Sequence, residues 1–442
     1  MKNSLQILLP EWLVTVNSGF EVLRQVAVVI ENNRIQSICA DDEIEQLPGY
    51  ATAEVTRLPD CVLMPGLVNS HTHASMSLLR GIADDLPLQQ WLQEHIWPAE
   101  SKWVDAAFIE DGFDLAAAEM IRSGTTCLNE MYYFPDLVAR RAQHIGMRTV
   151  VGLIVLDFPS PWAKNAEEYL HKALAVHDEV REYPLVTSAL APHAPYTVSD
   201  AALEKVAMYS SELDIAVHMH VHETAAEVEQ AQKDTGMRPL QRLDQLNLLN
   251  PNLVAVHMTQ LDAFEIERIA EAGVNVVHCP ESNLKLASGV CPVGELLNKG
   301  VNVSLGSDGA ASNNDLDLFA EMRSAALLAK QTSADAATCN ARQSIEMATI
   351  NGARALGLGK QIGSIEPGKY ADLIAVNMSA LNTQPLYNPV NQLVYALNSR
   401  QVSHVWINGV AQLKDYEFCH IDSAAILRKA KSWARKINPG SA

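Results

Sequence analysis

Three consecutive runs decide the fold of this chain: NLVAVHMTQL (252–261), GVNVVHCPES (273–282) and GVNVSLGSDG (300–309). Each is a short apolar run bounded by Gly, Asn, Pro or Asp, as strands commonly are. The segment Asp262–Ala272 between the first two is amphipathic, which predicts a helix. Near-continuous Val, Ile and Leu in such runs indicates strands that are buried on both faces, and this favours a parallel sheet.

The same alternation of apolar runs and amphipathic segments covers most of the chain. Amphipathic segments recur at Asp105–Ser123 and Asp200–Leu213. Eight strand–helix units predict an α/β fold with a (β/α)8 TIM-type barrel, and a doubly wound open sheet is the alternative. The five earlier strand candidates are CVLMPGLVNSHTH (61–73), GTTCLNEMY (124–132), RTVVGLIVLDF (148–158), PLVTSALAPHA (184–194) and DIAVHMHVHET (214–224).

The two ends of the chain have a different pattern. Both contain short alternating pieces that are typical of β-structure, so we expect one small β-sandwich domain assembled from residues 1–63 and 364–425. The barrel would then occupy residues 64–363. Residues 426–442, which are rich in Ala and Lys, are expected to form a surface helix and tail.

Composition excludes several classes of protein. Apolar residues make up 48% of the 442 and charged residues 19%, which is typical of a folded globular chain. The net charge of −19 argues against nucleic acid as a partner. Seven dispersed cysteines indicate reduced thiols. Pro10 and Glu11 interrupt the only apolar stretch near the N-terminus, and no run approaches the roughly 20 residues of a membrane span. We therefore expect a cytoplasmic protein with no membrane partner.

Polar residues gather at the ends of four of the predicted strands. The first ends in His71-Thr72-His73, the fifth contains HMHVHE (218–223), the sixth ends in His257 and the eighth in Asp308. In a barrel these ends meet on one face, and buried imidazoles or carboxylates are costly unless they are paired or bind a metal. The pattern therefore predicts a metal site.

Three histidines and a carboxylate suit a divalent cation such as zinc, with one position left for water. Residues 218, 220 and 222 alternate along one strand face, so spacing alone does not select the ligand among these three histidines. His278 and Cys279 are interpreted as a packed strand end.

A series of motifs runs from about residue 60 to 375. These motifs are MPGLVNSHTHASMSLLRG (64–81), IWPAE (96–100), LAPHAPYTVS (190–199), HVHET (220–224), HMT (257–259), HCPESNLKLASG (278–289), SLGSDGAASNNDLDLFAEM (304–322) and ATINGARALGLGKQIGSIEPGKYADL (348–373). In these motifs and in their order, the sequence resembles the amidohydrolase superfamily, and within it the 5-methylthioadenosine/S-adenosylhomocysteine deaminase family.

The resemblance implies a ligand set and a count of one metal. The implied ligands are His71, His73, His220 and Asp308. Relatives with two metals carry a bridging lysine at the end of the fourth strand, and LVTSALAPHAPYT (185–197) has none. One divalent ion per chain, with Zn²⁺ as the leading candidate, is therefore expected.

The resemblance also implies catalytic and substrate-binding roles. Glu223 would protonate the purine ring at N1 and then the leaving amine, His257 would orient the attacking water, and Asp308 would accept its proton. Glu100 would bind the ribose hydroxyls, since a carboxylate accepts from both hydroxyls of a diol. His193 would contact the nucleoside, so the expected partner is a small purine nucleoside. A homo-oligomer is expected on the same ground.

Three rival functions remain at this point. A guanine, pterin or cytosine deaminase would not need Glu100 for a ribose, a triazine chlorohydrolase would release chloride, and a silent member of the family would only bind or scaffold. Among thioether nucleosides, we expect 5′-methylthioadenosine to be preferred over S-adenosylhomocysteine. The loop LDFPSPWAKNAEEYL (156–170) contains no arginine for a carboxylate, and its Phe158, Pro159, Pro161 and Trp162 suit a methylthio group. Arg140, Arg141 or Arg148 would have to supply that cation instead.

Overall fold

The computed structural model describes residues 5–438, and its centre is a parallel sheet of eight strands. The strands pair in chain order from β6 to β13, and each strand is almost fully buried. Their bounds are β6 Leu67–Thr72, β7 Thr125–Glu130, β8 Arg148–Val155, β9 Val186–Pro192, β10 Val217–Val221, β11 Leu253–His257, β12 Asn275–His278 and β13 Asn302–Leu305. Burial on both faces is what the continuous apolar runs predict.

The first and last strands meet and close the barrel. The backbone N–H of Asp308 donates to the carbonyl of His71 over 3.1 Å, and Thr72 and Asp308 form a parallel β-bridge. Glycine is required at the seam, because a Cβ at Gly306 would lie 2.8 Å from Cβ of His71. The closure therefore brings together two segments that carry polar residues at their ends.

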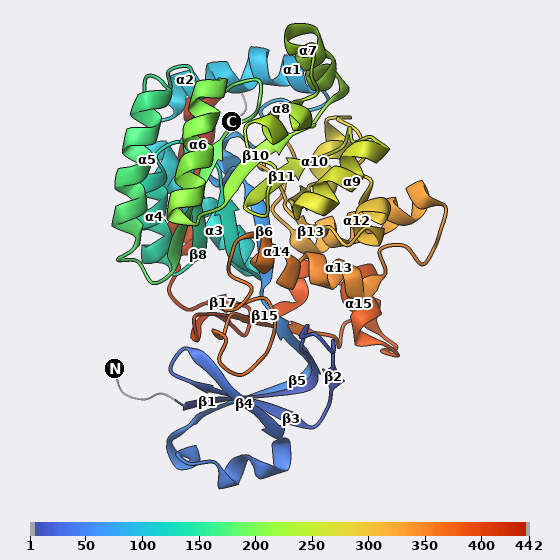
Figure 1. Cartoon of the computed structure of the whole chain (residues 1–442). Helices are drawn as coiled ribbons and strands as arrows, with labels where there is room; N and C mark the ends of the chain where they lie inside the picture. Colours follow the sequence, from blue (N-terminus) through green and yellow to red (C-terminus); the bar gives the residue numbers. More distant parts are fainter. Residues whose placement is uncertain (1–4, 439–442) are drawn as a thin grey trace.

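Helices surround the barrel and cover one of its ends. Figure 1 shows α1 Leu88–Gln90, α2 Trp97–Trp103, α7 Ala225–Thr235 and α8 Pro239–Gln245 at the end of the barrel that lies away from the sheet formed by the chain termini. The π-helical segment η4 Trp91–Ile96 joins α1 to α2. The remaining helices of this part are α3 Ala106–Arg122, α4 Pro135–Ile145, α5 Ala166–Val180, α6 Asp200–Leu213, α9 Ala263–Ala272, α10 Pro280–Lys285, α11 Val293–Asn298, α12 Leu318–Ser333, α13 Ala341–Met347, α14 Ile350–Ala355 and α15 Pro389–Tyr395.

A second, mixed sheet is built from both ends of the chain. Its strands pair in the order β17-β16-β15-β14-β5-β1-β3-β4, with β2 paired to β1. Blue N-terminal strands and orange to red C-terminal strands lie together below the barrel in Figure 1. The bounds are β1 Leu5–Val14, β2 Val22–Leu23, β3 Val26–Glu31, β4 Arg34–Ala40, β5 Glu54–Pro65, β14 Leu373–Asn377, β15 Val402–Ile407, β16 Val410–Lys414 and β17 Glu417–Phe418. The expected fold class, a TIM-type barrel with a small β-sandwich domain from both chain ends, is confirmed, and the residue boundaries between domains stay a prediction.

One expectation about the strands is wrong. Residues 61–73 do not form a single barrel strand, because β5 ends at Pro65 in the terminal sheet and β6 begins at Leu67 in the barrel. Between the two strands, the N–H of Gly66 donates to Asp372 and that of Leu67 donates to Gly124. A Cβ at Gly66 would lie 2.1–2.6 Å from side-chain atoms of Thr126, so only glycine fits at this junction.

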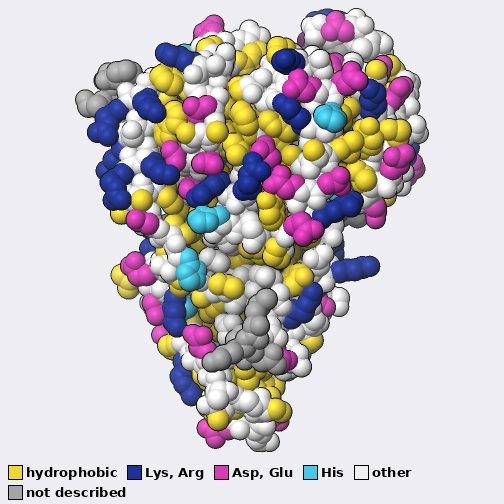
Figure 2. Space-filling model, turned by 90° about the vertical axis from the view of Figure 1, so that its left-hand side faces the viewer, with side chains coloured by type: hydrophobic (Ala, Val, Ile, Leu, Met, Phe, Trp, Pro, Cys, Tyr) yellow, Lys and Arg dark blue, Asp and Glu magenta, His cyan; other side chains and the backbone are white. Residues whose placement is uncertain are grey.

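The chain ends in a helix, α16 Ser423–Ile437, which packs on α3. Trp433 contacts Phe108 edge to face at 5.4 Å, and its indole N–H donates to Asp111. Residues 1–4 and 439–442, which belong to the predicted terminal segments, lie outside the described residues. Figure 2 shows the wide barrel above the narrow terminal sheet, with acidic and basic side chains interspersed over this face. Within residues 5–438, no helix has both the length and the apolar character that crossing a membrane requires.

Candidate metal centre and substrate pocket

Four side chains converge at the end of the barrel where the strands finish. His71 lies in β6, His73 follows it, His220 lies in β10 and Asp308 follows β13. Nε2 of His71 lies 3.2 Å from Oδ1 of Asp308 and 3.2 Å from Nε2 of His220. Nε2 of His73 lies 3.3 Å from the same two atoms. The structure thus brings the four expected ligands together.

In two of the histidines, the hydrogen bond made by Nδ1 shows that Nε2 is free to bind a metal. Nδ1 of His73 lies 2.5 Å from the carbonyl of Met131, and Nδ1 of His220 lies 2.8 Å from the carbonyl of His193. A carbonyl only accepts, so both Nδ1 atoms carry the proton and both Nε2 atoms present lone pairs. Two lone pairs that face each other at 3.3 Å repel unless a cation lies between them.

The spacing of the donor atoms matches a small divalent ion. Four of the distances between these donor atoms are 3.2–3.3 Å, and two ligand atoms that each lie about 2.0 Å from a tetrahedral zinc ion are separated by about the same distance. Burial lowers the pKa of His71 to about 4 and that of His73 below its usual value, so both rings are neutral and able to ligate. The group can therefore hold a divalent metal ion.

Serine hydroxyls hold the second oxygen of Asp308. Ser282 donates to Oδ2 over 2.6 Å and Ser312 over 2.8 Å, while the N–H of Gly309 donates to Oδ1. The three hydrogen bonds that Asp308 accepts favour the ionised form of its carboxyl group. The carboxylate is thus ionised, with Oδ1 turned to the metal position. Neither serine was identified from the sequence.

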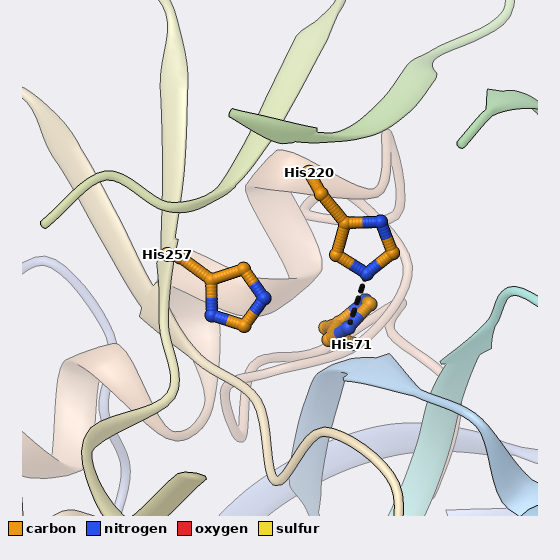
Figure 3. A group of neighbouring side chains, drawn as sticks. All are labelled: His71, His220 and His257. Atoms are coloured by element: carbon orange, nitrogen blue, oxygen red, sulfur yellow. Dashed lines mark hydrogen bonds between the residues drawn. The ribbon is translucent and has the colours of Figure 1, made fainter. Parts of the chain in front are cut away.

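His257 and Glu223 lie beside this group. Figure 3 shows the ring of His257, from β11, directed toward those of His71 and His220. Nδ1 of His257 lies 2.9 Å from Oδ1 of Asn283, and Nε2 lies 3.8 Å from Oε2 of Glu223. Burial raises the pKa of Glu223, which favours the protonated form. A buried carboxyl group with a raised pKa therefore lies beside His257.

The backbone is strained at two of these positions. His257 has φ of 75° and Asp308 has φ of 61°, in the left-handed region that residues other than glycine seldom adopt. Such conformations cost about 1–3 kcal/mol each and concentrate at functional sites. Here these backbone conformations direct the side chains of His257 and Asp308 toward the end of the barrel where the strands finish.

The other histidines of strand β10 have different surroundings. His218 is fully buried, and its Nε2 lies 2.9 Å from Nδ1 of His71. His222 does not share the ligand face, contrary to the alternation expected from the sequence. The strand ends at Val221, and φ of 54° at residue 222 turns the ring toward Leu240 and Glu265. His278 and Cys279 are buried at the end of β12, as expected of a packed strand end.

A pocket opens from the metal group, and it contains Glu100 and His193. Glu100, on α2, is 7% exposed and accepts a hydrogen bond of 2.7 Å from the hydroxyl of Tyr132. Burial raises its pKa to about 7. Nδ1 of His193 lies 3.1 Å from Oγ1 of Thr197, and burial lowers the pKa of this histidine to about 3. Trp97, Phe158 and Tyr196 also line the pocket.

Sequence reasoning missed Glu130, the last residue of β7. Its carboxyl accepts from the N–H of Ala74 and from the hydroxyl of Thr72 over 2.5 Å, so it holds the backbone on both sides of His73. Its position at the end of the second strand, the same end as the histidines, was a signal available in the sequence.

Comparisons with known proteins agree with this geometry. The model of the amidohydrolase family matches residues 62–411. The 5-methylthioadenosine/S-adenosylhomocysteine deaminase of Teredinibacter turnerae is 47% identical over 96% of each chain. The crystal structure of an adenosine deaminase from Xanthomonas campestris with bound zinc is 48% identical, with a TM-score of 0.96 over 98% of each chain. An atrazine chlorohydrolase from Arthrobacter aurescens, complexed with zinc, has a TM-score of 0.90 at 20% identity over 97% of this chain and 99% of its own, which indicates a shared fold alone.

Proposed function

Because the chain belongs to the amidohydrolase family, in its 5-methylthioadenosine/S-adenosylhomocysteine deaminase branch, we propose that it hydrolytically deaminates adenosine-type nucleosides with one zinc ion per chain. The observation that carries this proposal is the convergence of three Nε2 atoms and one carboxylate oxygen beside the buried Glu223. The products are the corresponding inosine-type nucleoside and ammonia.

The proposed ligands are His71, His73, His220 and Asp308. When bound, a divalent cation lowers the pKa of water and supplies a nucleophile at neutral pH. Asp308 would accept a proton from the attacking water, since the hydrogen bonds that it accepts keep its carboxylate ionised. His257 orients the water through Nε2, because Asn283 occupies its Nδ1.

Glu223 provides the proton that the purine needs. Attack at C6 places negative charge on the ring, and a proton delivered to N1 neutralises it. Glu223 then takes the proton of the hydroxyl formed at C6 and passes it to the amino group, which leaves as ammonia, and the proton held by Asp308 restores Glu223 to its protonated form. Its raised pKa suits this role, because a general acid must hold its proton near the working pH. Groups of this kind typically contribute about 10²–10⁴-fold to the rate.

Glu100 lies in the same pocket and is proposed to bind the ribose. Its carboxylate accepts one hydrogen bond from Tyr132, which leaves lone pairs for two sugar hydroxyls. His193 also lines the pocket, with its ring centroid 4.8 Å from that of His220, and is proposed to contact the nucleoside. A free base or a triazine has no diol for Glu100, so a nucleoside is the better fit.

The surroundings of the pocket support 5′-methylthioadenosine over S-adenosylhomocysteine. Within the described part of the chain, no lysine or arginine lines the pocket. The three arginines considered above point elsewhere: Arg140 pairs with Asp136 and Glu179, Arg141 with Asp114, and Arg148 with Asp372.

The expected methylthio cage in the loop 156–170 is only partly correct. Phe158 lines the pocket, but Pro159, Pro161 and Trp162 are not among its lining residues. Trp162 is drawn away because it packs against Tyr169 on α5. Arg242 lines an adjoining pocket that shares Trp97, Phe158 and Tyr196 with this one, but it is paired with Asp200. A homocysteine carboxylate would therefore enter a largely aromatic opening whose adjoining cation already has a partner.

An ammonia-release assay tests the proposed function. Adenosine, 5′-methylthioadenosine, S-adenosylhomocysteine, guanine and cytosine are compared, and the zinc content of the same sample is measured. The proposal expects turnover of the nucleosides and none of the free bases. Turnover of guanine or cytosine alone would contradict it, as would release of chloride from a chlorotriazine without any nucleoside turnover.

A further inference from the structure

His71 differs from the other two histidine ligands in the partner of its outer nitrogen. His73 and His220 bind backbone carbonyls, which no substitution removes. Nδ1 of His71 instead lies 2.9 Å from Nε2 of His218, a side chain in the middle of β10. The two rings meet edge to face at 77°, with centroids 4.9 Å apart. One ligand of the site is thus oriented by a side chain.

A carbonyl and an imidazole fix a neighbouring ring in different ways. A carbonyl can only accept, so it holds a proton on the ligand's Nδ1. A neutral imidazole has one N–H and one lone pair, so the pair His71–His218 has two tautomeric arrangements. In only one of them does Nε2 of His71 present a lone pair toward Asp308 and His220.

The surroundings of His218 show that its role is not general stabilisation of the fold. The ring is fully buried, and its Nδ1 has no hydrogen-bond partner among residues 5–438. Buried polar atoms without a partner are unfavourable, so an apolar side chain at this position would suit the barrel interior better. What His218 does offer is the acceptor for His71.

We propose that His218 is a positioning residue for the metal site. Its Nε2 accepts the Nδ1–H of His71, which leaves Nε2 of His71 free to ligate and fixes the plane of that ring. This inference rests on the metal site of the proposed function and adds one residue that contacts a ligand and not the metal. Partners of this kind typically change metal affinity by about 10–100-fold when they are removed.

Two substitutions at His218 and one matched control test the proposal. His218→Leu removes the acceptor at similar volume, and His218→Gln keeps an acceptor oxygen. The control is His404→Leu, at another buried histidine, which lies in β15 of the terminal sheet and stacks on Trp406. The dissociation constant for zinc is measured by competition with a chromogenic chelator. Thermal unfolding in excess zinc shows whether each variant is folded.

The expected result is a loss of zinc affinity in His218→Leu of about 10–100-fold, with recovery of most of it in His218→Gln and no change in the control. In saturating zinc, kcat of His218→Leu should return to within about threefold of the parent, because the residue acts through the ligand and not on the substrate. An unchanged zinc affinity in His218→Leu overturns the proposal, as does an equal loss in all three variants.

A measurement on the unaltered protein covers the case in which His218→Leu does not fold. The imidazole ¹⁵N spectrum of the zinc-loaded protein should show His218 protonated at Nδ1 and bare at Nε2. A proton on Nε2 of His218 would overturn the inference. Zinc binding without nucleoside turnover would refute the proposed function and leave this inference intact, so the two failures can be told apart.

Discussion

Glu100→Gln offers a test in which substrate affinity and protein stability should change in opposite directions. The carboxyl is buried on α2, and its one hydrogen-bond partner among the described residues is the hydroxyl of Tyr132. Burial raises its pKa from 4.5 to about 7. Glutamine retains the shape and an oxygen for Tyr132 but carries no charge.

The size of the effect on stability follows from the pKa. Each tenfold change in a proton dissociation constant corresponds to about 1.4 kcal/mol, so the displacement from 4.5 to about 7 amounts to about 3 kcal/mol. The unfolded chain releases this proton near pH 4.5 and the folded chain near pH 7, so the folded state loses stability as the pH rises between the two. The free energy of unfolding of Glu100→Gln, relative to the parent, should therefore increase by about 3 kcal/mol from pH 4.5 to pH 8.

The effect on activity should have the opposite sign. Hydrogen bonds to a charged group contribute about 1.5–3 kcal/mol and neutral ones about 0.5–1.5 kcal/mol. For two ribose hydroxyls the difference is about 2–3 kcal/mol, so kcat/KM of the parent should exceed that of Glu100→Gln by about 30–150-fold at pH 8. The ratio should fall toward one at pH 5.5, because most of the parent then carries a protonated Glu100.

The assays are denaturant unfolding in saturating zinc and ammonia release from 5′-methylthioadenosine, each over pH 4.5–8. Glu94→Gln, at an exposed glutamate in η4, is the matched control, and its difference from the parent in unfolding free energy and its ratio of kcat/KM should both stay constant over this range. A 2′,3′-dideoxy nucleoside should be turned over about equally by the parent and Glu100→Gln. If the ratio of kcat/KM and the difference in unfolding free energy both stay constant over this range, Glu100 is neither the ionised diol ligand nor a destabilising carboxylate.

Three further outcomes are expected. Elemental analysis should find about one divalent ion per chain, and verified chelation should abolish turnover; two ions per chain, or full activity without metal, would exclude the mononuclear site. Glu223→Gln should keep its metal and lose at least about 10²-fold in kcat, and loss of the metal in this variant would place Glu223 among the ligands. The kcat/KM for 5′-methylthioadenosine should exceed that for S-adenosylhomocysteine, and an equal or higher value for the latter would mean that a cation such as Arg242, in the adjoining pocket, binds its carboxylate.

The proposed ligands were accessible from the sequence because barrel strands are buried on both faces. His71, His73 and Asp308 stand at the ends of continuous apolar runs, where a polar residue has no packing role. The residues that hold those ligands in place could not be identified from the sequence in the same way. Ser282 lies on α10, and nothing in its segment indicates that it contacts Asp308. Glu130 stands at the end of β7, as the ligands stand at the ends of their strands, but this position does not indicate that it accepts from the backbone beside His73.

The sequence by itself therefore determined the eight-stranded pattern, the β-rich ends and the residue types of a metal site, since these depend on local periodicity and on the cost of burying polar groups. The tertiary structure decided which atom of each of these residues is available to bind a metal. It split the first predicted strand at Gly66, turned His222 away from the site and set His218 against His71. The physical reason is that barrel closure and hydrogen-bond partners join residues more than a hundred positions apart, such as His71 and Asp308. Spacing within a single strand carries no information about such contacts.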